Sequence, residues 1–554
     1  MSFEIRFLRD GIDDMRKERF DKKAELILKN GQFWTADPDQ PAAEALAVHK
    51  GRILEVGSWD QIQSFTGKET QLIDLEGAFV VPGFIDSHTH FLEGGLSLSS
   101  INLRNVKSRE EFVTKIKDEA QKLGKGKWIT DGEWDHQQFD SKQLPKKEWI
   151  DGVTPENPVC VNRKDMHMAL ANSLALKIAG VTKHTSNPEG GEIAKNPGTG
   201  EPTGILTDAA VDLVLKKIPE PGHEDKVKAA KKAVKFAHKK GVTSVHEMGP
   251  ISNLEIYEEL YKRRELDLRI CLYPPISLID HWPASQIKRK ERKNFYKVGG
   301  LKGFVDGSLG SSTALFFEPY TDNANHQGLL VSDMFPEGKM EERIQKADKE
   351  GLQVAVHAIG DKANHIILNI FEKVMKSGQK RDRRWRIEHA QHLIPEDIVR
   401  MGELEILASV QPYHLIDDGQ WAEKRIGSSR LGYSYPYRSL LENKAKLAFG
   451  SDWTVAPLDP ILGIFSAVTR STLDGKNPQG WVPKEKISVQ EAVEGYTSTA
   501  AFAEFSENIK GSLKKGKFAD MVVLDKNLLK IDPFEIKDTQ ILLTLFDGRI
   551  VYKK

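Results

Sequence analysis

Eight short apolar segments between Gly83 and Val455, several of them separated by amphipathic helical stretches, constrain the fold of this 554-residue chain most strongly. Strands that alternate with helices predict a parallel sheet, because a parallel crossover needs a helix to return the chain. Eight such strands predict a closed TIM (β/α)8 barrel. An open doubly wound sheet competes, but no glycine-rich phosphate turn follows any strand. The expected strands are GFIDSHTH, GVTSVHEMG, LRICLYPPI, LKGFVDGSLG, LQVAVHAIGD, RWRIEHAQHL, LASVQPYHL and LAFGSDWTV, and the expected helices include residues 223–241, 339–351, 362–378 and 487–504.

The two ends of the chain have a different pattern. Short apolar runs separated by Asn30-Gly31, Lys50-Gly51 and Glu76-Gly77 predict antiparallel hairpins, and Asp547-Gly548 is a strong hairpin turn near the C-terminus. We expect the two pieces to form one small sheet domain. This gives residues 1–80 and 509–554 to that domain and residues 81–508 to the barrel.

One segment inside the barrel region does not follow the alternation of strands and helices. It runs from about residue 101 to about residue 219 and contains KWITDGEWDHQQF and NPVCVNRKDMHMALANSLAL. We interpret it as a large insertion after the first barrel strand, placed over the mouth of the barrel.

Composition restricts the partners and the compartment. The chain has 80 basic and 80 acidic residues and no basic block interleaved with aromatics, so no nucleic-acid partner is expected. Its two cysteines, Cys160 and Cys271, cannot build a disulfide framework. Without an apolar run of about 18 residues or a leader-like start, no membrane partner is expected. We therefore expect a cytoplasmic protein with a small-molecule substrate, and a homodimer stays open.

The stretch VVPGFIDSHTHF places two imidazoles at the end of the first expected barrel strand. Side chains alternate faces along a strand, so His88 and His90 project to the same side, about 6 to 7 Å apart. Two nitrogen ligands can then converge on one metal ion. Two solvated histidines at a strand end are the simpler alternative.

Four more polar residues lie in or just after later expected strands. Lys302 lies in the fourth, while His357, His389 and Asp452 follow the apolar parts of the fifth, sixth and eighth. Active sites of such barrels lie at the carboxyl ends of the strands. A buried charge or imidazole needs a partner, and a shared divalent cation would supply one for all six residues. The alternative, six independently satisfied core groups, does not account for their common position.

This layout resembles the amidohydrolase superfamily of metal-dependent hydrolases, with a barrel and a small β-sandwich domain formed by both chain ends. LKGFVDGSLGSSTA, RWRIEHAQ and PLDPILGIFSAVTRS most resemble its amidohydrolase 3 group, which includes N-substituted formamide deformylases, and GSLKKGKFADMVVLD resembles the return to the sandwich. The resemblance implies that the metal ligands are His88, His90, Lys302, His357, His389 and Asp452.

Lys302 needs its own argument. An ammonium with a pKa of about 10.4 would repel a divalent metal. Desolvation lowers a lysine pKa, and the neutral amine can react with carbon dioxide to give a carbamate. The resemblance implies that such a carboxylated Lys302 bridges two metals. In the alternative mononuclear site, His88, His90, a histidine of the fifth strand and Asp452 hold one metal, and Lys302 binds substrate.

The expected chemistry is hydrolysis of a carbon–nitrogen bond in a non-peptide amide or formamide. Zinc suits these ligands, although manganese, iron or nickel could occupy the same set. A bound metal lowers the pKa of water from 15.7 towards about 7 and so supplies hydroxide, while Asp452 acts as the catalytic base. A deaminase, a lactonase, an isomerase or a non-catalytic barrel stays open, because a fold does not determine its chemistry.

Other candidates have weaker signals. Arg163, Asp165 and His167 either anchor substrate or form a salt-bridged knot inside the insertion. His414 either stabilises an oxyanion or is a core or surface residue, and His246 occupies the equivalent position on the second strand. The aromatic candidates for an apolar pocket, each of which could equally be core, are Phe91, Trp134, Tyr413 and Trp453.

Overall fold

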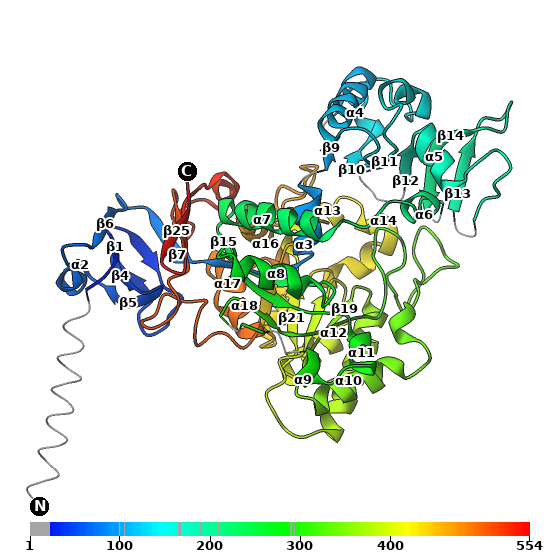
Figure 1. The fold of residues 1–554 in the computed structure, drawn as a ribbon. Coiled ribbons are helices and arrows are strands. Elements are labelled where there is room, and N and C mark those ends of the chain that lie inside the picture. The colour runs from blue at the N-terminus through cyan, green and yellow to red at the C-terminus, as the bar shows by residue number, and fades with distance from the viewer. Residues whose placement is uncertain are drawn as a thin grey trace, which may run out of the picture. The chain divides into compact units, whose positions relative to one another are not determined.

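The computed structural model describes residues 23–98, 100–104, 106–163, 168–188, 191–208, 210–287, 291–292 and 294–554. The chain divides into two compact units. The first contains the residues up to 92 together with residues 230–554, and the second contains residues 93–229. Figure 1 shows the elements of both.

Two parallel sheets form the centre of the first unit. Their strand orders are β17-β16-β15-β8 and β18-β19-β20-β21-β22, and each of the eight expected apolar segments overlaps one of these strands, whereas β17 was not expected. Only Gly299 separates β17 from β18, so one stretch of chain joins the two sheets. At the other end, a parallel bridge pairs Thr89 with Trp453. The strands are β8 (Phe84–Thr89), β15 (Val242–Glu247), β16 (Arg269–Leu272), β17 (Tyr296–Val298), β18 (Gly300–Phe304), β19 (Gln353–Ala358), β20 (Arg386–His389), β21 (Leu407–Val410) and β22 (Leu447–Phe449).

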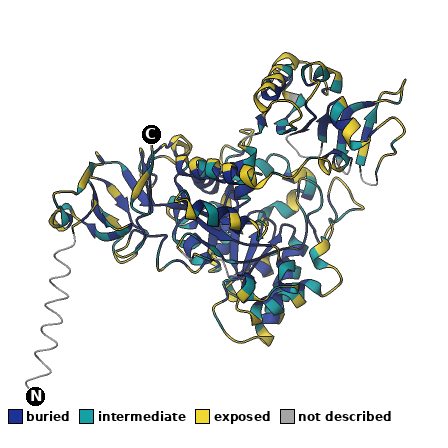
Figure 2. Ribbon diagram, viewed as in Figure 1, coloured by how far each residue is buried: buried dark blue, intermediate teal, exposed yellow. Residues whose placement is uncertain are grey.

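Helices follow most of these strands, and the strands themselves are buried (Figure 2). In α11, Ala363, Ile367 and Phe371 recur at helical spacing and are buried, which is the amphipathic pattern that packs a helix on a sheet. Among the described residues, no helix is both long and apolar enough to cross a membrane. The helices of this part are α7 (His223–Lys239), α8 (Asn253–Lys262), α9 (Ala284–Ile287), α10 (Lys339–Lys349), α11 (Asp361–Ser377), α12 (Pro395–Glu403), α13 (Pro412–Asp418), α14 (Ala422–Ile426), α15 (Tyr437–Glu442), α16 (Pro460–Thr469), α17 (Val489–Gly495) and α18 (Ser498–Ala503).

The expected single helix over residues 487–504 is two helices, α17 and α18. Thr497 lies between them with φ −132° and ψ −93°, which is outside the helical region. Its hydroxyl donates a hydrogen bond to the Val493 carbonyl at 2.7 Å, so the side chain replaces part of the interrupted helical bonding.

The chain ends share sheets, and the red C-terminal strands lie beside the blue N-terminal strands in Figure 1. Strand β23 pairs with β7 in antiparallel register, within a sheet whose strand order is β25-β24-β23-β7-β2-β3. A second sheet has the strand order β5-β4-β1-β6. The expectation of hairpin pairing alone is wrong, because β1 pairs with β6, and β2 with β7, in parallel. The strands are β1 (Leu26–Lys29), β2 (Gln32–Trp34), β3 (Ala42–Ala43), β4 (Ala45–His49), β5 (Arg52–Gly57), β6 (Gln71–Asp74), β7 (Phe79–Pro82), β23 (Met521–Leu524), β24 (Ile541–Phe546) and β25 (Arg549–Lys553).

One apolar cluster joins these two sheets. Leu28 of β1, Val80 of β7 and Met521 of β23 belong to it, so residues more than 400 positions apart in the sequence share a core. Asp547 and Gly548 both have positive φ, at 50° and 74°, and connect β24 to β25 as the expected tight turn.

The second unit contains the expected insertion, but its secondary structure was not expected. Among the described residues of this unit, the strands have the order β13-β14-β12-β11-β10-β9. Trp134 is fully buried in its apolar cluster and donates from Nε1 to the Val161 carbonyl at 2.8 Å. Its elements are β9 (Ile101–Asn102), α4 (Arg109–Leu123), β10 (Ile129–Trp134), β11 (Val159–Arg163), β12 (Met168–Ala171), α5 (Ser173–Ala179), β13 (Gly191–Lys195), β14 (Pro202–Asp208) and α6 (Asp212–Leu215).

Candidate metal centre

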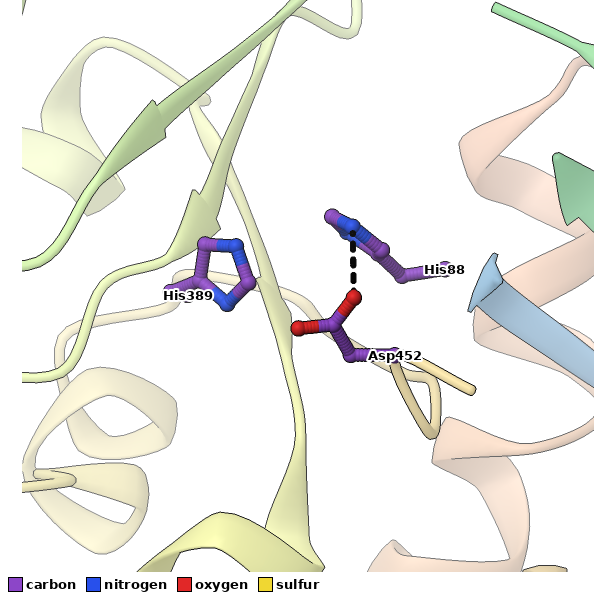
Figure 3. Close-up of side chains that lie close together, drawn as sticks. All are labelled: His88, His389 and Asp452. Carbon is purple, nitrogen blue, oxygen red and sulfur yellow. Dashed lines mark ion pairs between the residues drawn. The ribbon is translucent and has the colours of Figure 1, made fainter. Parts of the chain in front are cut away.

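Three of the six predicted metal ligands form a buried group. His88 comes from β8, His389 from β20 and Asp452 from the turn after β22, and the ligand atoms that these residues offer all lie within 4.8 Å of one another. Figure 3 shows the three side chains converging, with His88 Nε2 at 3.5 Å from Asp452 Oδ1. Two imidazoles and a carboxylate at this spacing can hold one divalent cation.

Backbone pairing between β8 and the turn after β22 creates this arrangement. The Asp452 amide donates to the His88 carbonyl, and the His90 amide donates to the Trp453 carbonyl, each at 2.7 Å. The buried Asp86 carboxylate ties the same two segments, because its Oδ1 accepts from the amides of His88 at 3.2 Å and Ser451 at 2.9 Å. The ligand-bearing segments are therefore fixed through their backbones.

His90 and His414 lie around the same carboxylate. His90 Nε2 is 3.3 Å from Asp452 Oδ1. His414, in the first turn of α13, places its Nε2 3.9 Å from Asp452 Oδ2. Its ring stacks against that of His389, with 6.2 Å between the ring centroids. Asp452 is thus the carboxylate on which three imidazoles converge.

Lys302 and His357 lie on neighbouring strands next to this group. The His357 ring centroid is 4.5 Å from that of His389. His357 Nε2 lies 3.0 Å from the Gly307 carbonyl oxygen, which can only accept, so Nε2 carries the proton in the neutral ring. The lone pair of His357 is then on Nδ1, which fixes the nitrogen that can bind a metal.

Burial shifts the pKa values of the candidate ligands in directions that favour metal binding. It lowers the pKa of His357 to about 3 and holds that of His389 well below its usual range, so both imidazoles are neutral at pH 7. Burial also lowers the pKa of Lys302 to about 8. For Asp452 burial opposes ionisation, but the imidazoles of His88, His90 and His414 outweigh it and lower the pKa of this carboxyl.

Several buried nitrogen atoms of the described residues lie unpaired at this centre. Within the described part of the chain, Lys302 Nζ, His389 Nδ1 and His414 Nε2 are buried and have no hydrogen-bond partner. Buried polar atoms are normally satisfied, so a group of such atoms at one site requires an explanation. Nitrogen and carboxylate donors without thiolate suit zinc and its neighbours in the first transition series. The residues present therefore fit a divalent metal.

A family model described as the amidohydrolase family matches residues 71–552, which is well over half of the sequence. This chain belongs to the amidohydrolase family. The match confirms the resemblance drawn from the sequence, and membership of this metal-dependent family implies a divalent metal.

Three relatives of this amidohydrolase-family chain align with 96% of it. LONG AFTER FAR-RED 3 of Arabidopsis thaliana is 43% identical, with 92% of its length covered. YtcJ of Bacillus subtilis, which carries an amidohydrolase name, is 33% identical over its whole length. The N-substituted formamide deformylase of Arthrobacter pascens is 26% identical, with 98% covered. The solved structure of an uncharacterized metal-dependent hydrolase from Pyrococcus furiosus is similar with a TM-score of 0.74 and 31% identity, covering 91% of this chain and 100% of that one.

Other candidates in this amidohydrolase-family chain lie elsewhere. His246, on β15, accepts a hydrogen bond at Nδ1 from Arg386 at 2.8 Å and has Glu504 at 3.5 Å from Nε2, so its contacts are with buried charges. Arg163 belongs to the second unit and pairs with Asp135 at 3.1 Å. Asp165 and His167 lie outside the described residues.

The aromatic candidates for an apolar pocket also lie in different parts of the structure. Trp134 belongs to the core of the second unit. Phe91 is fully buried against Trp453 with 5.9 Å between ring centroids, and the same tryptophan stacks on Phe236 at 5.4 Å. Tyr413 lies in the first turn of α13, next to His414. Phe91 and Trp453 therefore pack between elements of the first unit.

Sequence reasoning missed three residues beside the centre. Glu388 contacts His88, Asp306 Oδ1 lies 3.5 Å from His357 Nε2, and Phe304 contacts both Lys302 and His357. Asp306 Oδ1 accepts from the Ile359 amide at 3.0 Å, and its Oδ2 accepts from the Gly360 amide at 2.9 Å. Phe304 lies two positions after Lys302 on the same strand face and Asp306 lies two further on, so a search of flanking positions could have found these two, whereas strand alternation places Glu388 on the face opposite His389.

Proposed function

We propose that this protein is a metal-dependent hydrolase of carbon–nitrogen bonds in non-peptide amides or formamides. The observation that carries the proposal is the buried group of His88, His389 and Asp452 at the strand ends. Family membership supports the hydrolase class, and the name of the 26% identical Arthrobacter relative supports the type of bond.

The architecture that we infer is a closed (β/α)8 barrel with a β-sandwich built from both chain ends. The bridge between Thr89 and Trp453 supports closure of the barrel, because it joins the first strand to the segment after the last. The apolar cluster between the two terminal sheets supports the sandwich. We assign residues 1–80 and 509–554 to the sandwich and residues 81–508 to the barrel with its insertion.

We propose zinc or another divalent metal, one or two ions per chain, which His88, His90, His357, His389 and Asp452 would hold, with a carboxylated Lys302 as a further oxygen ligand. Lys302 is 4% exposed and its Nζ has no hydrogen-bond partner among the described residues. A neutral amine in such a position can add carbon dioxide, losing one proton, to become an anionic carbamate with two oxygen donors. A non-carboxylated lysine beside a single metal is the alternative.

A bound divalent metal supplies Lewis acidity, which polarises a carbonyl group and makes water more acidic. Asp452 then takes the proton of the attacking water on its carboxylate and later delivers that proton to the leaving amine. His414, whose Nε2 is 3.9 Å from Asp452 Oδ2, can donate a hydrogen bond to the oxygen that becomes negative.

The side chain of Phe304 supports a substrate with an apolar substituent. Phe304 shares a strand face with Lys302, and its ring lies 4.6 Å from Lys302 Nζ and 5.2 Å from the His357 ring. It remains 37% exposed, so an aromatic surface is available next to the ligands. Such a surface favours an apolar group beside the scissile bond. A deaminase, a lactonase or an isomerase would use the same ligands with a different bond.

Metal analysis combined with substitution of His88 and His90 tests the proposal. The parent protein should hold one or two divalent ions, and His88→Ala or His90→Ala should strongly lower metal content and activity towards N-acyl and N-formyl amines. Removal of one imidazole deletes one bond between the protein and the metal, so the remaining ligands hold the metal more weakly. Full metal occupancy in the variant that carries both His88→Ala and His90→Ala would show that the metal binds elsewhere. A parent protein without metal would favour a non-catalytic barrel.

A further inference from the structure

His88 has a partner on each of its ring nitrogens. Nε2 faces Asp452, and Nδ1 lies 2.5 Å from Glu388 Oε2. Both His88 and Glu388 are buried, and Glu388 is 0% exposed. Glu388 Oε1 forms an ion pair at 2.6 Å with Arg386 Nε, and both side chains are fully buried, so the permanently charged guanidinium has this carboxylate as its negative partner. The group that faces Nδ1 is therefore an ionised carboxylate.

Arg386 fixes the carboxylate in turn. Its Nε donates to Glu388 Oε1 at 2.6 Å, and its Nη2 donates to the Ser87 carbonyl at 2.6 Å and to Ser409 Oγ at 2.8 Å. Nη1 donates to His246 Nδ1 at 2.8 Å. Arg386 is fully buried, so these bonds are shielded from water. The guanidinium thus leaves Oε2 of the glutamate directed at His88.

We propose that Glu388 is a positioning residue that holds His88 as the Nδ1–H tautomer, so that the Nε2 lone pair faces the metal site. An ionised carboxylate only accepts hydrogen bonds, so the nitrogen at 2.5 Å must carry the proton. A neutral imidazole has one N–H, which leaves the lone pair on Nε2. The metal role of His88 rests on the proposed function, whereas the tautomer does not.

Glu388→Gln tests this because it keeps the shape and reverses the hydrogen bond. Arg386 can only donate, so the amide oxygen turns to Arg386 and the NH2 group faces His88. Nδ1 must then accept, the proton moves to Nε2, and the lone pair no longer faces Asp452. We expect metal affinity, measured by competition with a chelator using zinc as the probe, to fall by about 10- to 100-fold.

Glu485→Gln is a matched control. Glu485 is also buried, and its carboxylate accepts from the amide of Ser439 at 2.9 Å and from its hydroxyl at 2.6 Å, with no candidate ligand among these partners. The control should keep the zinc affinity of the parent. A similar loss in both variants would assign the effect to the loss of a buried charge and overturn the proposal.

The tautomer of His88 can be measured in the absence of metal and without an activity assay. In metal-free protein labelled with 15N-histidine, the His88 signals are assigned by their loss in His88→Asn. The parent should show a protonated Nδ1 and an unprotonated Nε2, and Glu388→Gln should show the reverse. An Nε2–H tautomer in the parent overturns the proposal even if the variant does not fold. Failure of the hydrolase proposal alone would leave the parent tautomer unchanged.

Discussion

Two of the candidate ligands have backbone conformations that side chains rarely adopt. His389 has φ 75° and Asp452 has φ 58°, both in the left-handed region. Such residues cost of the order of 1–3 kcal/mol each and persist only where the surrounding structure holds them. The backbone hydrogen bond from Asp452 to His88 is one such restraint. The backbone strain at these two residues therefore indicates that the ligand positions are maintained at a cost in local stability.

Asp452→Asn separates the proposed chemistry from metal binding. Asparagine keeps the size and one oxygen of aspartate but cannot accept a proton, while the histidines and Lys302 still surround the metal. We expect metal content to fall little and kcat to fall by about 10²- to 10⁴-fold, the range for a positioned general base. Elemental analysis and turnover of any established substrate measure the two effects. Turnover within a few fold of the parent, at full metal content, would place the base elsewhere, with His414 as the next candidate.

His392 gives a prediction on stability at low pH. It is buried between the rings of Phe316 and Tyr435, with Nδ1 2.9 Å from Ser434 Oγ, and burial lowers its pKa to about 3. Between pH 6.5 and about 3 the unfolded chain binds a proton here and the folded chain does not, so stability falls as pH falls through this window.

His392→Gln should therefore lose less stability on acidification than the parent does. The contribution is at most about 1.4 kcal/mol per pH unit below 6.5. Thermal midpoints of both proteins at pH 7 and pH 4.5 provide the measurement, and the difference at pH 7 serves as the baseline for any packing effect of the substitution. Equal midpoint losses in the two proteins would contradict a neutral, buried His392.

At the scale of elements, the sequence located the parallel strands well because their apolar runs are local signals. The same reasoning could not place Glu388. In β20, Arg386 and Glu388 share a face by alternation, and the positive φ of His389 then breaks the alternation, so two consecutive residues both reach the centre. Alternation predicts opposite faces for such neighbours. Backbone dihedrals of single residues are set by tertiary contacts that a sequence pattern does not contain.

The sequence also did not predict which distant strands pair with each other. The turn at Glu76-Gly77 favours local hairpin pairing, but β7 pairs with β2 and β23. In the insertion, β10 pairs with β11 in a register that shifts between Asp131 and Trp134, which breaks the regular alternation that identifies a strand. The pairing partner and the register of a strand depend on the complete core, whereas apolar runs and turn residues are local features of the sequence.

At the scale of the whole molecule, the C-terminal strands connect the chain ends to the central strands. Met521 and Leu545 contribute to the apolar cluster shared with β1 and β7. Arg269 of β16 donates from Nε to Asp520 Oδ2 at 2.6 Å, and both side chains are buried. Loss of Asp520 would leave this guanidinium without its main partner, and breaking a buried pair destabilises a protein by about 3–5 kcal/mol.

A chain that stops after Gly511 should therefore be insoluble. It lacks β23, β24 and β25, so β7 loses a neighbour, the shared cluster opens and Arg269 loses Asp520. A chain that stops after Asp547 is the matched control. It loses only β25, an edge strand with largely exposed side chains, and should stay soluble with a modestly lower thermal midpoint. Solubility, size-exclusion chromatography and thermal unfolding compare the two. If the shorter chain is soluble, monomeric and thermally unchanged, the sandwich does not depend on both chain ends, and the proposed division of the chain is wrong.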